Sequence, residues 1–218
     1  MSRLLNRAAT MPKATALPGF ERIQRYWDPT NRCWTAKILP GEFYVTRDAE
    51  AVTTVLGSCI SACIRDPQLG CGGMNHFMLP EEAAGGNGSW NAADGGASTR
   101  YGSYAMESLV NELLKLGGRR ERFEVKLFGG GRILPTMTDV GMRNIAFAQS
   151  FLKLEGFKVA AQDVGDVYPR RIVYFPATGR VLLKHLRAID SNVIASRETQ
   201  YRANLGATTA GNDVELFD

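Results

Sequence analysis

Two short apolar runs rich in β-branched residues stand on either side of the tripeptide Gly57-Ser58-Cys59. The runs cover residues 51–56 and 60–64, and their length and composition are typical of buried β-strands. A Gly-Ser pair between two such strands predicts a sharp backbone turn. We therefore expect a β framework that presents the thiol of Cys59 at a turn between strands.

The whole chain has the composition of a soluble globular protein. Its 218 residues, 44% of them apolar, suit one domain with extensions. No run reaches the roughly 18 apolar residues of a membrane span, and the N-terminal segment lacks the apolar core of a secretory signal. The predicted location is therefore the cytoplasm, without membrane insertion. In that compartment the four cysteines are expected to be thiols rather than disulfides.

Changes in composition divide the chain into four regions. Residues 1–20 are predicted to be a disordered tail, 21–42 an aromatic N-terminal arm, 43–190 the domain itself, and 191–218 a polar extension. Within the domain, the glycine-rich segment 81–98 is open to interpretation as a lid or as a simple insertion. The modest net charge of +4 is partly concentrated near the N-terminus. We interpret this as a solvated tail, and no nucleic-acid partner is predicted.

Strand and helix patterns alternate along the domain. Residues 99–116 and 140–154 carry apolar side chains at helical spacing, and each segment ends at glycine. Residues 188–194 are interpreted as a further edge element. Together the elements predict an α/β sandwich with a mixed β-sheet. Beyond the two runs around Cys59, the predicted strands begin near residue 43 and cover the approach to residue 79, 123–128, 158–161, and a hairpin formed by 171–175 and 180–186.

His76 lies seventeen residues after Cys59, in another extended segment. A histidine has an ordinary pKa of about 6.5, so it is suited to take a proton from a thiol near neutral pH. A third polar group commonly orients such a base. The candidates for this role are Thr53, Thr54, Ser58 and Ser61, and their spacing does not choose among them.

The backbone N–H groups of the turn at Gly57, Ser58 and Cys59 are candidates to bind the oxyanion of a tetrahedral intermediate. Together with a Cys–His pair, this predicts acyl transfer on an amide, thioester or ester.

Simpler interpretations apply to several of these residues. Cys63 and Cys71 are expected to pack in the core, Cys33 to be an inert thiol, and His185 to be an ordinary strand residue. Cys59, Cys63, Cys71 and His76 also form a weak candidate for a Cys3His zinc site, because their spacing lacks the usual close cysteine pairs. The segment 129–132 matches no nucleotide-binding motif and is interpreted as a turn, with close backbone approach to a substrate as the alternative.

Several motifs resemble the CheD family of chemoreceptor glutamine deamidases. The most specific are LGSC at 56–59 and GGMNHFMLP at 72–80. The resemblance covers about residues 43–187. It continues through LVNELLKLG at 109–117, FGGG at 128–131, VGMRN at 140–144 and YPRRIVYFPATGRVLLK at 168–184.

The resemblance implies hydrolysis of glutamine side-chain amides on chemoreceptor cytoplasmic helices, which yields glutamate and ammonia without a cofactor. By the same resemblance Cys59 is the nucleophile, His76 the base and Thr53 the third member. The implied fold is a three-layer α/β sandwich with two main helices, and a CheC-type phosphatase is an implied additional partner. Two alternatives remain open at this point: a non-catalytic receptor- or phosphatase-binding module, and a receptor methylesterase.

Overall fold

The computed structural model describes residues 15–80, 97–133 and 140–210. In these residues ten strands and three α-helices alternate broadly as the sequence predicts. The strands are β1 (Gln24–Asp28), β2 (Cys33–Lys37), β3 (Phe43–Thr46), β4 (Ala51–Leu56), β5 (Ile60–Asp66), β6 (Cys71–Asn75), β7 (Glu124–Gly129), β8 (Val159–Val164), β9 (Arg170–Phe175) and β10 (Arg180–His185). The helices are α1 (Ala97–Lys115), α2 (Val140–Leu154) and α3 (Ala188–Ala210).

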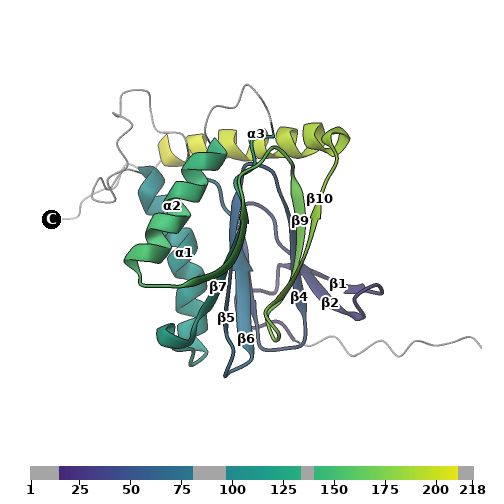
Figure 1. The fold of residues 1–218 in the computed structure, drawn as a ribbon, viewed down its shortest axis with the longest axis vertical. Coiled ribbons are helices and arrows are strands. Elements are labelled where there is room, and N and C mark those ends of the chain that lie inside the picture. Colours follow the sequence, from purple (N-terminus) through teal and green to yellow (C-terminus); the bar gives the residue numbers. More distant parts are fainter. Residues whose placement is uncertain (1–14, 81–96, 134–139, 211–218) are drawn as a thin grey trace, which may run out of the picture.

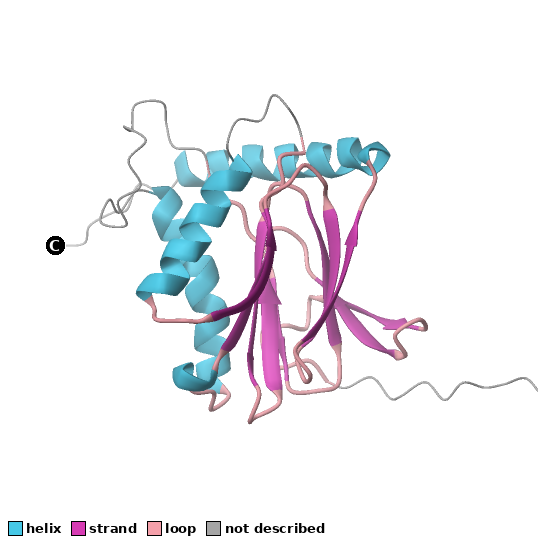
Figure 2. Cartoon of the chain, in the orientation of Figure 1, coloured by secondary structure: helices cyan, strands magenta, loops and turns pink. Residues whose placement is uncertain are grey.

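The strands form two five-stranded sheets, ordered β1-β2-β4-β9-β10 and β3-β6-β5-β7-β8. Each sheet is mixed, because β2 pairs parallel with β4 in the first and β7 pairs parallel with β8 in the second. Helices α1 and α2 cover the outer face of the second sheet, so the molecule has three layers (Figures 1 and 2). The predicted α/β class is confirmed, and the strands divide between two sheets.

The apolar stripes predicted for the two helices face the core. On α1 the buried side chains include Met106, Leu109 and Leu113, and on α2 they include Ala148 and Leu152. Strands β5 and β6 lie beneath these helices and are themselves almost completely buried. A strand covered on both faces has no polar face, which explains why β5 reads as a nearly continuous apolar run.

The predicted N-terminal arm is an antiparallel hairpin. Trp27 on β1 pairs with Trp34 on β2, and their rings make an edge contact at 6.0 Å. The hairpin extends the first sheet through the β2–β4 pairing. The hairpin is therefore attached to the domain by backbone pairing with β4 and not only by aromatic contacts.

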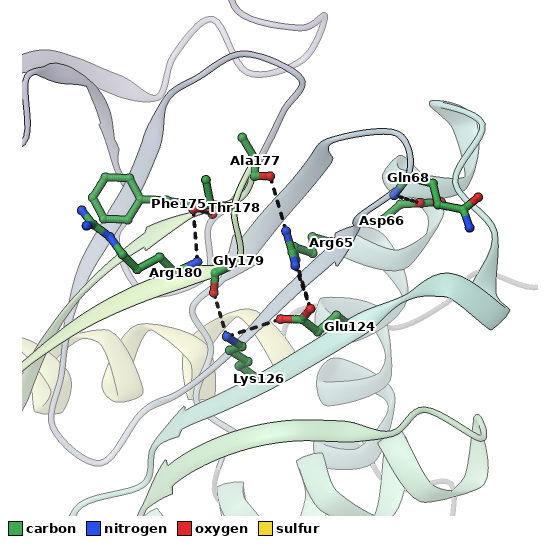
Figure 3. Close-up of polar contacts among 10 residues, drawn as sticks. All are labelled: Arg65, Asp66, Gln68, Glu124, Lys126, Phe175, Ala177, Thr178, Gly179 and Arg180. Carbon is green, nitrogen blue, oxygen red and sulfur yellow. Dashed lines mark hydrogen bonds and ion pairs between the residues drawn. The ribbon is translucent and has the colours of Figure 1, made fainter.

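The connection between β4 and β5 lies at the end of the sheets crossed by α3 (Figure 1). A charged cluster joins the two sheets near the β9–β10 turn, at the other end (Figure 3). Arg65 pairs with Glu124 at 2.9 Å, and Lys126 donates to the carbonyl oxygen of Gly179 at 2.8 Å. This cluster fixes the sheets to each other well away from Cys59.

One region differs from the sequence predictions, and three others cannot be compared with them. Residues 188–194 are not an edge element, because they begin α3, which continues through most of the predicted polar extension. Residues 1–14 of the predicted tail, 81–96 of the glycine-rich segment, and 211–218 lie outside the described residues. None of the described helices is long and apolar enough to span a membrane.

Candidate active site

The turn at Gly57-Ser58-Cys59 is held by hydrogen bonds to all three of its carbonyl oxygens. Gly131 N donates to Gly57 O at 2.8 Å, and Gly130 N donates to Cys59 O at 2.7 Å. The side chain of Asn144 donates to Ser58 O at 2.8 Å. With the carbonyl groups fixed in this way, the three N–H groups are directed toward the opposite side of the turn.

The glycine-rich segment after β7 makes this bracing feasible. Gly129 has φ +117°, and a Cβ atom there would collide with the carbonyl oxygen of Cys59. Glycine is therefore required for the backbone of the segment to approach the turn so closely. The close approach of this segment is made to the backbone of Cys59, whereas the sequence suggested a substrate as the alternative.

Asn144 is a positioning residue that the sequence analysis did not identify. It lies in the first turns of α2 and is fully buried. Besides holding Ser58 O, its side-chain oxygen accepts a hydrogen bond from Leu79 N at 2.9 Å. The available signal was an amide within the apolar stripe of α2, since a buried polar side chain needs specific partners.

A short backbone bridge brings His76 close to Cys59. Ile60 N donates to Phe77 O at 2.9 Å, and Phe77 N donates to Ile60 O at 3.0 Å. Ile60 and Phe77 directly follow Cys59 and His76 in the chain. The Cys59 sulfur and a ring nitrogen of His76 consequently lie within 4.8 Å of each other.

The hydrogen bonds of Thr54 determine which nitrogen of His76 carries the proton. Thr54 Oγ1 donates to Ile38 O at 2.8 Å and lies 2.7 Å from His76 Nδ1. A hydroxyl group has one proton, so Thr54 accepts from Nδ1–H. Nε2 is then the unprotonated nitrogen, and this buried atom has no hydrogen-bond partner in the described structure. His76 thus has its basic nitrogen free to receive a proton.

The assignment of Thr53 as the third member differs from this geometry. Thr53 Oγ1 donates to Ile172 O on β9 at 2.7 Å, whereas its neighbour Thr54 contacts the histidine. Adjacent residues of a strand point to opposite faces, so only one of the two can face His76. Among the other candidates, Ser61 bonds to Asn75 O and Ser58 bonds to Glu198.

Burial keeps both members of the Cys–His pair neutral. Cys59 has no exposed surface and His76 is 2% exposed. Burial raises the pKa of the Cys59 thiol well above its usual value, and the nearby Glu198 carboxylate raises it further. Burial alone lowers the pKa of His76 to about 3. In this conformation the site holds a thiol and a neutral imidazole.

Glu198 of α3 is the second residue that the sequence analysis missed. Its carboxylate accepts hydrogen bonds from Gly57 N at 2.8 Å, Ser58 N at 2.8 Å and Cys59 N at 3.3 Å. Ser58 Oγ also donates to it, at 2.6 Å. The N–H groups proposed to hold an oxyanion do bind a negatively charged oxygen. Glu198 lies in a segment without apolar periodicity, so no sequence signal singled it out.

The only group with metal-ligand geometry among the described residues consists of Cys59, His76 and Glu198. These side chains include the thiol and imidazole that zinc prefers. The carboxylate oxygens, however, already accept N–H and O–H donors. The proposed Cys3His set does not assemble, since Cys63 and Cys71 do not join this group.

The remaining cysteines behave as the sequence predicts. All four are free thiols, and Cys63 and Cys71 are buried in the core. Cys33 is half-buried on β2, with its sulfur 3.8 Å from Thr35 Oγ1. Burial raises the pKa of Cys63, which is consistent with an unreactive thiol.

Comparison with known proteins identifies relatives along nearly the whole chain. A family profile described as CheD chemotactic sensory transduction matches residues 78–185. A probable chemoreceptor glutamine deamidase CheD from Halorhodospira halophila is 50% identical over 97% of this chain and 97% of its own length. Proteins of the same name from Hydrogenovibrio crunogenus and Hahella chejuensis are 52% and 46% identical, over 89% and 94% of this chain and 100% and 96% of their own lengths. The chain therefore belongs to the CheD family.

Proposed function

We propose that this protein hydrolyses glutamine side-chain amides of chemoreceptors to glutamate and ammonia, with Cys59 as nucleophile and His76 as base. The observation that carries the proposal is the position of the Cys59 thiol. It lies within 4.8 Å of a ring nitrogen of His76, whose Nε2 has no hydrogen-bond partner in the described structure, and it belongs to a turn whose backbone N–H groups already hold a carboxylate. The names of the relatives supply the substrate class.

In the first half of the reaction, His76 Nε2 takes the thiol proton while the sulfur attacks the amide carbon of a glutamine side chain. The N–H groups of Gly57, Ser58 and Cys59 stabilise the developing oxyanion. When the tetrahedral intermediate collapses, the C–N bond breaks and His76 gives its proton to the leaving nitrogen. Ammonia departs and a thioester joins Cys59 to the substrate.

In the second half, water attacks the thioester carbon while His76 again serves as base. The C–S bond breaks, the sulfur leaves, and the proton held by His76 returns to it as the thiol is restored. The product is a glutamate on the substrate protein. No step requires an oxidant, a reductant or a metal ion.

We assign the orienting role to Thr54 rather than to Thr53. Thr54 accepts a hydrogen bond from Nδ1–H and donates one to Ile38 O, so it fixes both the tautomer and the plane of the ring. A base held in one tautomer and one ring orientation uses the same nitrogen each time that it takes up or gives back a proton. The hydroxyl of Thr53 is engaged with β9 and supports the strand.

Receptor methylesterase activity is the alternative reaction for the same groups. The N–H groups recognise a carbonyl oxygen and make no contact with the leaving group, so they would accept an ester as well as an amide. The two reactions differ in the leaving group, since an amide nitrogen must be protonated to depart. The acid role of His76 is therefore more demanding for the amide.

Turnover of one chemoreceptor cytoplasmic fragment in two forms separates these reactions. One form carries the glutamine amide and the other the glutamate methyl ester, and site-resolved mass spectrometry follows both. We expect amide hydrolysis that is lost in Cys59→Ala. A protein that hydrolyses only the ester would be a methylesterase, and one that binds the fragment without hydrolysing either form would be a binding module.

The cellular setting belongs to the same proposal. Its substrates would be the cytoplasmic helices of chemoreceptors, so the enzyme would work in the cytoplasm. A CheC-type phosphatase is a further candidate partner, implied by the family resemblance.

A further inference from the structure

Helix α3 crosses the end of the sheets where the Gly57–Cys59 turn lies (Figure 1). A helix packed on a globular domain normally buries a continuous apolar stripe. Among the described side chains of α3, in contrast, Ala195 and Glu198 are the buried ones. Glu198 and its hydrogen bonds are therefore a polar point of attachment for α3.

The Glu198 carboxylate occupies the place that the proposed mechanism gives to the oxygen of the reacting amide. It accepts hydrogen bonds from the three N–H groups of the turn and from Ser58 Oγ. A Cβ atom at position 57 would lie 2.8 and 2.9 Å from its oxygens, so this approach requires glycine. One of these oxygens also lies within 4.8 Å of the Cys59 sulfur.

The group in the site has the chemical identity of the proposed product. Deamidation of a glutamine on a helical segment yields a glutamate on a helical segment, and Glu198 is a glutamate in the middle of α3. Its side chain reaches the N–H groups from a helix lying over the turn. A glutamine carried by another helix could place its side-chain oxygen in the same position.

The Glu198 carboxylate must leave the N–H groups of the turn before a glutamine oxygen of another protein can bind them. Cys59 has no exposed surface and His76 is 2% exposed, so a glutamine of a second protein cannot reach the sulfur. The carboxylate further opposes ionisation of the thiol, because it raises the pKa of Cys59 both as a nearby negative charge and as a hydrogen-bond acceptor. The conformation with Glu198 bound is therefore closed and unreactive.

We propose that α3 is a built-in product mimic, which occupies the site of a substrate helix and must be displaced by it. This inference rests on the proposed deamidase function for the identity of the substrate. The site then takes glutamines that project from an α-helix, with the side-chain oxygen bound by the Gly57–Cys59 N–H groups. Substrate and α3 compete for the same groups, so the apparent affinity for substrate is reduced by the fraction of molecules that are closed.

Two other features indicate where α3 is held and where a substrate could enter. Tyr201, one turn beyond Glu198, is hydrogen bonded through its hydroxyl to that of Tyr101 on α1. Beside α3 lies a groove of about 650 Å³ whose lining includes His76, Ile194 and Glu198. Tyr201 thus forms a second point of attachment, and the groove leads from the surface to the histidine.

The test compares the full-length protein with Glu198→Ala, using Gln200→Ala as the matched control on an exposed position of the same helix. Two quantities are measured: the rate of Cys59 alkylation by iodoacetamide, and kcat/KM on a chemoreceptor fragment. We expect Glu198→Ala to raise both by at least about ten-fold, because the closed fraction falls. Gln200→Ala should match the wild type.

Tyr201→Phe provides a second variant that leaves the N–H groups and the carboxylate intact. It removes the hydrogen bond to Tyr101 and should raise both rates in the same direction, by a smaller factor. If neither Glu198→Ala nor Tyr201→Phe increases alkylation, α3 does not close the site and the inference is wrong. The proposed function would be unaffected by that result if the wild type deamidates the receptor fragment. Conversely, faster alkylation without deamidation by any variant would support closure by α3 and contradict the function.

Glu198→Gln tests the product-mimic part directly, because it places the proposed substrate group in the site. We expect Cys59 to attack residue 198 and release ammonia, so that mass spectrometry finds a thioester to Cys59 or a glutamate at position 198. Neither should form in the Cys59→Ala, Glu198→Gln double variant, and Gln200 should remain an amide. An amide that persists at position 198, in a Glu198→Gln protein that deamidates receptor fragments, would show that α3 does not mimic the product.

Discussion

Thr54 Oγ1 lies 2.7 Å from His76 Nδ1 and donates a hydrogen bond to Ile38 O, so the histidine is held with Nε2 unprotonated. The hydroxyl of the neighbouring Thr53 instead donates a hydrogen bond to Ile172 O. The two threonines are equally buried. They form a matched pair for testing which of them orients His76 in the proposed reaction.

We predict that Thr54→Val lowers kcat by about 10- to 100-fold, a part of the 10²–10⁴ that a positioned general base contributes. Thr53→Val should change kcat by much less. Thr53→Val loses one buried hydrogen bond and Thr54→Val loses two, so we expect them to lose about 1 and about 2 kcal/mol of unfolding free energy, respectively. Kinetics and denaturant unfolding of the two proteins check this. A larger kcat loss in Thr53→Val would restore the assignment implied by the family resemblance.

We predict that Asn144 affects catalysis by holding the Gly57-Ser58-Cys59 turn in place. Asn144→Ala leaves Ser58 O and Leu79 N without their buried partner, which should cost about 2–3 kcal/mol of stability and lower kcat. Leu152→Ala is the control, since it creates a cavity in the same helix far from the turn and should cost about 2–5 kcal/mol. Unfolding curves measure the loss of stability, and kcat measured below the melting transition reports the loss of catalysis separately. Equal kcat in the two variants would show that Asn144 acts only on stability.

The buried histidine predicts a pH dependence of stability. Because the pKa of His76 falls to about 3 on folding, the unfolded chain binds a proton below pH 6.5 that the folded protein does not. Stability from this group is therefore complete above pH 6.5 and is lost as pH falls toward 3. The loss should be about 2 kcal/mol between pH 6.5 and 5. Denaturant unfolding at several pH values gives the dependence of the unfolding free energy on pH. This dependence should be weaker in His76→Asn than in the wild type, and His185→Asn is the control. An unchanged pH dependence in His76→Asn would contradict the lowered pKa of His76.

The sequence predicts the parts of the fold that have a clear hydrophobic period. Strands β4 and β5 around Cys59 and the helix α2 appear where their patterns place them, with α1 beginning two residues early. Such patterns do not predict that the strands divide between two sheets, because pairing between distant strands leaves no local signal. The far-end cluster of Arg65, Glu124 and Lys126 is likewise a product of tertiary packing (Figure 3).

The candidate site was predictable only in part, for related reasons. Cys59 and His76 stand out by residue type and by the turn beside the cysteine. The choice between Thr53 and Thr54 depends on which face of β4 meets the histidine, and this is fixed by the pairing of β4 with β2 and β9. Glu198 lies about 140 residues from the turn it binds, in a polar helix without an apolar stripe. No local pattern marks such a contact.

The central claim is that Cys59 deamidates glutamines of another protein. The most direct measurement is site-resolved mass spectrometry of a chemoreceptor cytoplasmic fragment incubated in ¹⁸O-labelled water. Wild type and Glu198→Ala should convert specific glutamines to glutamates that carry one labelled oxygen, whereas Cys59→Ala should reduce the rate by about 10⁴-fold or more. Conversion by Cys59→Ala at the wild-type rate, or no conversion by either protein that retains the thiol, would contradict the account.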